Sequence, residues 1–161
     1  MKPDTVLLAD AGHVRDGLIY VIGGGIEQMY TASLPAIVQA TIIARVLLEE
    51  EELDKEHTLQ LAVRPEAGGD PVAVMQGKFV AKQPANKSAP PAFVTAIKLD
   101  GMALPDYGRY ILAFAVDDDL MKEFHIVLAK PEALRRRSTD AGAKTSPANP
   151  TIRPKARRRK S

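Results

Sequence analysis

Two acidic runs are the densest groups of potentially reactive side chains in the sequence. Residues 49–52 are four glutamates and residues 117–119 are three aspartates. Carboxylates bind divalent cations when several of them converge from alternating positions of a structured loop, as calcium-binding loops do at one end of some β-sandwiches. Neither run has this spacing by itself. We therefore expect both runs to be solvent-exposed connections between strands and predict no metal site.

Residues suited to covalent or acid–base catalysis are scarce. The chain has no cysteine and three histidines, which excludes a disulfide framework, a thiolate metal site and a cysteine nucleophile. The sequence contains no HExxH, GxSxG or SxxK motif and no histidine and carboxylate at a recognisable catalytic spacing. We therefore predict that the protein is not an enzyme and uses no cofactor.

Glycines 23–25 follow an apolar run, a position where a phosphate-binding loop could occur. The segment lacks the Gly-Lys-Ser/Thr ending of a Walker loop and the third spaced glycine of a dinucleotide-binding loop. β-Branched runs, which favour strands over helices, surround it. A bulge or a turn that redirects the chain is the favoured interpretation.

Basic residues concentrate in the last part of the chain. Residues 1–130 contain 12 Lys and Arg against 18 Asp and Glu, a net charge of −6, whereas residues 131–161 contain 10 against 2, a net charge of +8. The low hydrophobicity and high like charge of this segment are typical of disorder. We therefore predict a folded domain over residues 1–130 and a disordered basic tail over residues 131–161.

A basic tail can neutralise phosphates and release counterions, which gives salt-sensitive and sequence-independent binding of nucleic acid. The tail has no aromatic residue, so base stacking is not available to it. A purely solubilising tail, or one that folds back on the acidic domain, is the alternative. The candidate polyanion-binding residues are Arg135, Arg136, Arg137, Lys144, Arg153, Lys155, Arg157, Arg158, Arg159 and Lys160.

Alternation of apolar and polar residues predicts β-strands in the folded part. Leu59, Leu61 and Val63 share one face of an extended chain. The Asp16-Gly17 pair lies between two apolar runs, and this combination indicates a β-hairpin. We therefore expect the first two strands to be antiparallel neighbours.

The apolar segment 36–48 is the one whose secondary structure is ambiguous. As a strand it places Val38, Ala40 and Ile42 on one face; as a helix it begins at Pro35 and runs into the four glutamates. Its density of β-branched residues favours the strand. The segment is also too short, and too interrupted by polar residues, to span a membrane.

Asp106, Gly108 and Tyr110 stand at alternate positions at the start of an apolar strand, which is the spacing of a tyrosine corner. In such a corner the tyrosine hydroxyl bonds to an upstream backbone group. This pattern, together with the strand periodicity, predicts an all-β fold. The expected architecture is an antiparallel Greek-key sandwich, immunoglobulin-like, with about seven to eight strands.

The sequence resembles a family of small bacterial proteins of unknown function. The resemblance lies in residues 8–11, 16–20 and 22–25, in the alternation from Leu59 to Val63, and in the Gly-x-Tyr strand at Gly108. It covers most of residues 5–129. The family implies a compact β-sandwich and supplies no catalytic residues. The Asp106-x-Gly108-x-Tyr110 pattern also resembles immunoglobulin-type sandwiches, although leucine stands at position 112 where their second cysteine would follow.

The first residues lack the long apolar segment of a secretory signal, so we expect a cytoplasmic protein. A rigid sandwich without a recognisable active site suits a binding or accessory module whose partner is another protein. Its expected surfaces are the two acidic loops, the glycine turn and an edge strand. Nucleic-acid binding through the tail is the alternative function.

Overall fold

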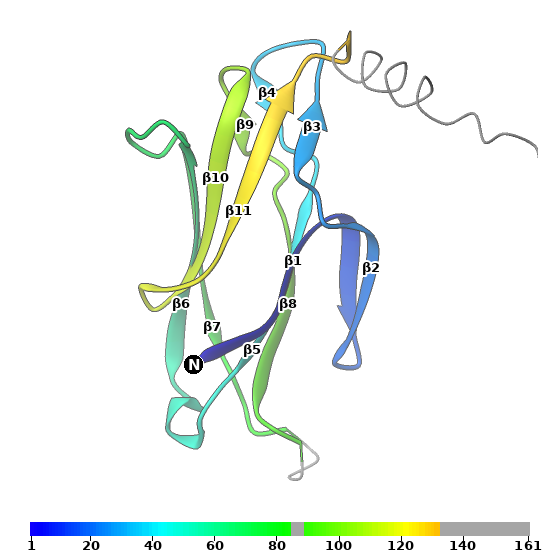
Figure 1. The fold of residues 1–161 in the computed structure, drawn as a ribbon. Coiled ribbons are helices and arrows are strands. Elements are labelled where there is room, and N and C mark those ends of the chain that lie inside the picture. Colours follow the sequence, from blue (N-terminus) through cyan, green and yellow to red (C-terminus); the bar gives the residue numbers. More distant parts are fainter. Residues whose placement is uncertain (85–88, 133–161) are drawn as a thin grey trace, which may run out of the picture. The chain divides into compact units, whose positions relative to one another are not determined.

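A computed structural model describes residues 1–84 and 89–132. The chain divides into two units, Met1–Pro131 and Glu132–Ser161. The first unit is an all-β domain, and it contains all the elements discussed below (Figure 1). Antiparallel sheets dominate it, which confirms the predicted fold class at this level.

The described residues form eleven strands and one short 3-10 helix, η1 (Glu50–Glu52). Eight strands have seven or more residues: β1 (Lys2–Arg15), β2 (Leu18–Gly24), β5 (Thr41–Leu47), β6 (Glu56–Pro65), β7 (Ala73–Val80), β8 (Ala92–Lys98), β10 (Gly108–Val116) and β11 (Asp119–Ala129). Three are short: β3 (Gln28–Tyr30), β4 (Ala36–Ile37) and β9 (Ala103–Leu104).

Two large sheets share these strands. The first has the order β2-β1-β5-β8 and the second the order β3-β11-β10-β6-β7; β4 and β9 form a separate two-stranded ladder. The pairing of β3 with β11 is parallel, and all other pairs are antiparallel. The parallel pair and the three short strands were not predicted, because a strand of two or three residues has no measurable periodicity.

Strand β1 contributes to two different ladders. Its first half pairs with β5 and its second half with β2, and Ala9 is the residue where the two ladders meet. Beyond Ala9, β1 and β2 form a hairpin beside the first sheet (Figure 1). The turn uses Asp16 at φ 53° and Gly17 at φ 73°, the backbone angles that an Asp-Gly hairpin turn favours. The predicted hairpin is therefore confirmed, and its first strand is longer than the apolar run that indicated it.

One hydrophobic cluster lies between the two large sheets. It combines Leu8, Ile42 and Val46 of the first sheet with residues such as Leu61 and Phe114 of the second, all of them less than 2% exposed. Alternation brings these side chains to one face of each strand, and their burial is the main favourable contribution to folding.

Segment 36–48 is extended, so the helical alternative is wrong. The segment is not one strand, however: β4 pairs with β9, whereas β5 pairs with β1 and β8. The intervening Val38 and Ala40 are joined to the region before β9 by hydrogen bonds between Val38 N and Met102 O, at 2.9 Å, and between Leu99 N and Ala40 O, at 2.9 Å. Both side chains are buried, as predicted for this face.

Candidate functional site

The two acidic loops predicted as separate connections lie at the same end of the domain, where His57 joins them. His57 begins the inward face of β6 and its side chain is 5% exposed. Its Nδ1 lies 2.6 Å from Oδ2 of Asp117, and its Nε2 lies 2.6 Å from the carbonyl oxygen of Glu52. The ring also packs against Phe79, with ring centroids 5.2 Å apart.

Both nitrogens of His57 face acceptor oxygens, and only the protonated imidazole can donate to both. Burial lowers the pKa of His57, but the hydrogen bonds to Asp117 and to the Glu52 carbonyl and the nearby negative charges outweigh it, so its pKa is raised above 6.5. Burial likewise opposes the charged form of Asp117, yet the bonds from His57 and from the Thr58 amide hold the pKa of its carboxyl below the usual value.

This arrangement differs from a catalytic histidine–carboxylate pair. A triad histidine uses one nitrogen on the carboxylate and keeps the other for the nucleophile. In this domain the second nitrogen of His57 is occupied by the Glu52 carbonyl oxygen. The geometry therefore fits a structural link between the two loops, which we call the clasp: His57 joins Asp117 of one loop to Glu52 of the other. Neither ring nitrogen is left for proton transfer to a substrate.

The carboxylates of the clasp are also fully engaged. Asp117 accepts from His57 with one oxygen and from the Thr58 amide, at 2.7 Å, with the other. Glu52 accepts from the Met1 ammonium at 2.6 Å and from the Glu49 amide at 2.8 Å. No group of three or more His, Asp or Glu residues suited to a metal occurs among residues 1–84 and 89–132. Glu52 is therefore not the freely solvated residue that the sequence predicted.

The predicted tyrosine-corner residues lie at the start of β10. The Tyr110 hydroxyl donates to the Asp106 carbonyl oxygen at 2.7 Å and accepts from the Asp106 amide at 3.3 Å. Gly108, between them, has φ +154°, which favours glycine. These hydrogen bonds fix the position at which β10 enters the sheet, so the role of the three residues is structural.

The glycine turn at residues 23–25 carries the chain from the first sheet to the second. Gly25 and Ile26 both donate their amides to the Leu8 carbonyl oxygen, at 2.8 and 3.2 Å. Gly23 has φ +64°, and a Cβ there would overlap the carboxylate of Asp10. Gly23 is therefore required by this close backbone path, which agrees with the predicted redirecting turn.

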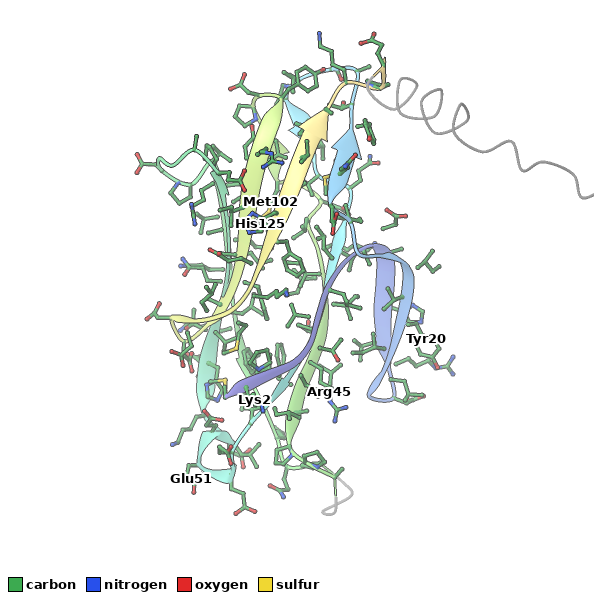
Figure 2. All side chains as sticks on the ribbon, viewed as in Figure 1. Lys2, Tyr20, Arg45, Glu51, Met102 and His125 are labelled. Atoms are coloured by element: carbon green, nitrogen blue, oxygen red, sulfur yellow. The ribbon has the colours of Figure 1, made fainter. Side chains whose placement is uncertain are left out.

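A groove of about 670 Å³ lies next to this turn, between β1 and β11. Charged side chains at its rim pair with one another: Glu66 contacts His125 at 2.9 Å and Arg109 at 3.3 Å. His125 is the exposed histidine that the alternation of β11 places on the outer face, and Figure 2 labels it there. These ion pairs occupy the charged side chains at the rim of the groove.

The β1–β2 hairpin presents a different surface. One face of the hairpin packs on β5: Gly12 contacts Ile43, whose side chain lies on the side of β5 turned away from the main core. The residues on this face of the hairpin are half-buried. The opposite face exposes Leu18 by 60%, Tyr20 by 45% and Ile22 by 71%. The Tyr20 ring stacks on that of His13, with centroids 4.7 Å apart. We call Leu18, Tyr20 and Ile22 the hairpin row; Figure 2 labels Tyr20 on it.

Sequence reasoning missed both the clasp and the hairpin row. His57 continues the alternation of Leu59, Leu61 and Val63, and this signal could have predicted its burial. Its partner Asp117 is 60 residues away, so no local pattern indicates the pair. The predicted polyanion-binding residues of the tail, between Arg135 and Lys160, lie outside the described residues.

The structure is therefore a two-sheet β domain. The clasp joins its two acidic loops, and its β1–β2 hairpin exposes the apolar hairpin row. Residues 4–129 match a family of unknown function, DUF6941, and the chain belongs to this family. A comparison with curated proteins finds no match. In the part of the chain that the structure describes, no helix is long and apolar enough to cross a membrane.

Proposed function

We propose that this domain is a non-catalytic module that binds a protein partner through the hairpin row. The observation that carries the proposal is the exposure of three large apolar side chains, Leu18, Tyr20 and Ile22, on one face of a single hairpin. Scattered exposed apolar residues are ordinary, whereas a contiguous apolar patch is typical of an interaction site. Tyrosine is also enriched among residues that dominate binding energy.

An immunoglobulin-like architecture is part of this proposal. The strand orders β2-β1-β5-β8 and β3-β11-β10-β6-β7, and the bond from Tyr110 to the Asp106 backbone at the start of β10, support it. Domains of this architecture place binding surfaces on rigid strands and on the loops at their ends. The absence of catalysis and the cytoplasmic location stay predictions of the sequence.

The test is co-purification from the native cell with nuclease present. The bait is the full chain, and Tyr20→Lys is compared with Val74→Lys, which places the same charge at a 54% exposed valine of β7. We expect a defined set of proteins with the wild type and with Val74→Lys, and its loss with Tyr20→Lys. Recovery of the same proteins by all three baits would contradict the proposal.

Nucleic-acid binding through residues 131–161 is the second candidate function. It is favoured by the charge of this segment, which has 10 basic and 2 acidic residues while the rest of the chain is acidic. Contacts between basic side chains and phosphates supply sequence-independent affinity that falls as salt rises. This candidate involves a different part of the chain, so it does not compete with the hairpin for the same surface.

A further inference from the structure

Strand β2 is the outermost strand of its sheet, and its edge lacks the usual protection against pairing. Edge strands normally carry a charged residue, a proline or a bulge. Residues 17–25 contain no charged residue and no proline. We propose that β2 pairs in antiparallel orientation with β2 of a second copy of this chain. This inference rests on the proposed function, because it names the partner of the hairpin row.

The amino-acid order of β2 is self-complementary. Antiparallel pairing centred on Tyr20 places Leu18 opposite the partner's Ile22, and Tyr20 opposite its own equivalent. Ile19 then faces the partner's Val21 on the other side of the sheet. Each pair joins side chains of similar size and polarity, and such cross-strand pairs stabilise a sheet. A two-fold interface requires this kind of match between a surface and itself.

The same register explains the position of the glycines after β2. With Tyr20 on the two-fold axis, the turn residues Asp16 and Gly17 lie opposite the partner's Gly24 and Gly23. A charged turn therefore meets backbone without side chains. Asp16 is also paired with Arg15 at 3.5 Å, so the turn adds little net charge to the interface.

Charge and buried area indicate how strong the pairing is. In a two-fold dimer, a charged residue near the centre of β2 would lie close to the same charge on the partner strand and repel it. Strand β2 has no charged residue. Complete burial of the exposed parts of the hairpin row would cover on the order of 300 Å² per copy, and edge-to-edge pairing covers only the sides of these side chains, so the interface is well below the about 800 Å² per copy of a standard stable interface. We therefore expect a weak dimer that forms as the concentration rises.

The first experiment measures the mass of the full chain by sedimentation equilibrium over a wide concentration range. We expect the average mass to rise from 17.4 kDa toward twice this value. Val74→Lys should behave like the wild type, because β7 is the edge of the other sheet. A mass of one chain at every concentration would overturn the proposal.

A second experiment tests the register with two double variants. Leu18→Lys with Ile22→Lys places like charges opposite each other and should give a monomer at all concentrations. Leu18→Lys with Ile22→Glu places opposite charges across the interface and should retain the dimer. Equal association of both variants would exclude this register. Since all these residues are exposed, circular dichroism should show the same fold in each variant.

A covalent test is also direct, because the chain has no cysteine. Tyr20→Cys places two thiols next to each other on the two-fold axis, within the range of a disulfide. Under mild oxidation we expect a disulfide-linked dimer that forms at least tenfold faster than with Val74→Cys. Equal rates would contradict the pairing. A monomeric chain whose hairpin row still captures another protein would overturn this inference and leave the proposed function standing.

Discussion

At the residue scale, the domain uses its few polar buried groups to hold segments together. The two buried polar or charged residues found among those described are Thr41 and His57, and every buried side-chain polar atom in that part has a hydrogen-bond partner. Burial of a polar group is costly unless it is hydrogen-bonded, so these bonds are requirements of the fold. His57 and Tyr110 therefore lead to specific predictions.

The clasp should make stability depend on pH. Because the pKa of His57 is raised in the folded state, this residue stabilises the fold fully below its unfolded pKa of 6.5, and the stabilisation is lost as pH rises through the folded pKa. We expect the free energy of unfolding of the wild type to fall more steeply than that of His57→Gln as the pH rises above 6.5. Urea unfolding at a series of pH values measures the difference.

His13→Gln is the comparison variant for the loss of a histidine as such, since His13 is exposed and lies outside the clasp. An NMR titration of the wild-type His57 ring supplies a readout that does not depend on a variant. A titration midpoint at or below 6.5 would contradict the clasp as described.

Tyr110→Phe should lower the free energy of unfolding by about 1 kcal/mol, the usual contribution of one hydrogen bond, because it removes the bonds to the Asp106 backbone. Tyr107→Phe is the matched comparison: its hydroxyl makes a longer bond of 3.2 Å to the Thr31 carbonyl oxygen, and the loss should be smaller. Chemical denaturation measures both. A larger loss for Tyr107→Phe would argue against a special role of the corner.

At the element scale, the β1–β2 hairpin packs on the first sheet through one face, where Gly12 meets Ile43. An isolated two-stranded hairpin is marginally stable in water, so its packing on the first sheet matters. Gly12 permits this packing, because a Cβ at this position would overlap Cδ1 of Ile43 and lie 2.8 Å from the Tyr20 carbonyl oxygen.

Gly12→Ala should therefore destabilise the domain by about 1–3 kcal/mol, the usual cost of overpacking. We also expect faster hydrogen exchange of the β2 amides. Gly77→Ala is the matched control, since a Cβ there meets nothing within 4 Å. Unchanged β2 exchange in Gly12→Ala would show that the hairpin tolerates the added methyl group.

At the scale of the whole molecule, the chain combines an acidic domain with a basic segment, and these are expected to act separately. Removal of residues 131–161 should abolish binding to a DNA duplex of arbitrary sequence and leave thermal unfolding of the domain unchanged. The affinity of the full chain should fall steeply as salt rises. Fluorescence anisotropy and calorimetry measure these two properties. DNA binding retained by residues 1–130 would rule out the tail as the binding segment.

The sequence by itself determined the local features of this protein. Periodicity identified the long strands, and the Asp16-Gly17 pair identified the hairpin, because these signals depend on the backbone preferences of neighbouring residues. The same reasoning favoured extended structure for residues 36–48, although the division into β4 and β5 followed from their different partners.

Only the tertiary structure decided which distant groups meet. His57 and Asp117 are 60 residues apart and become neighbours because β6 and β10 are adjacent strands of one sheet. Gly12 meets Ile43 because β1 changes partners at Ala9, and that change exposes the hairpin row. Such contacts depend on sheet order and on packing across the core, which the alternation of single strands does not encode.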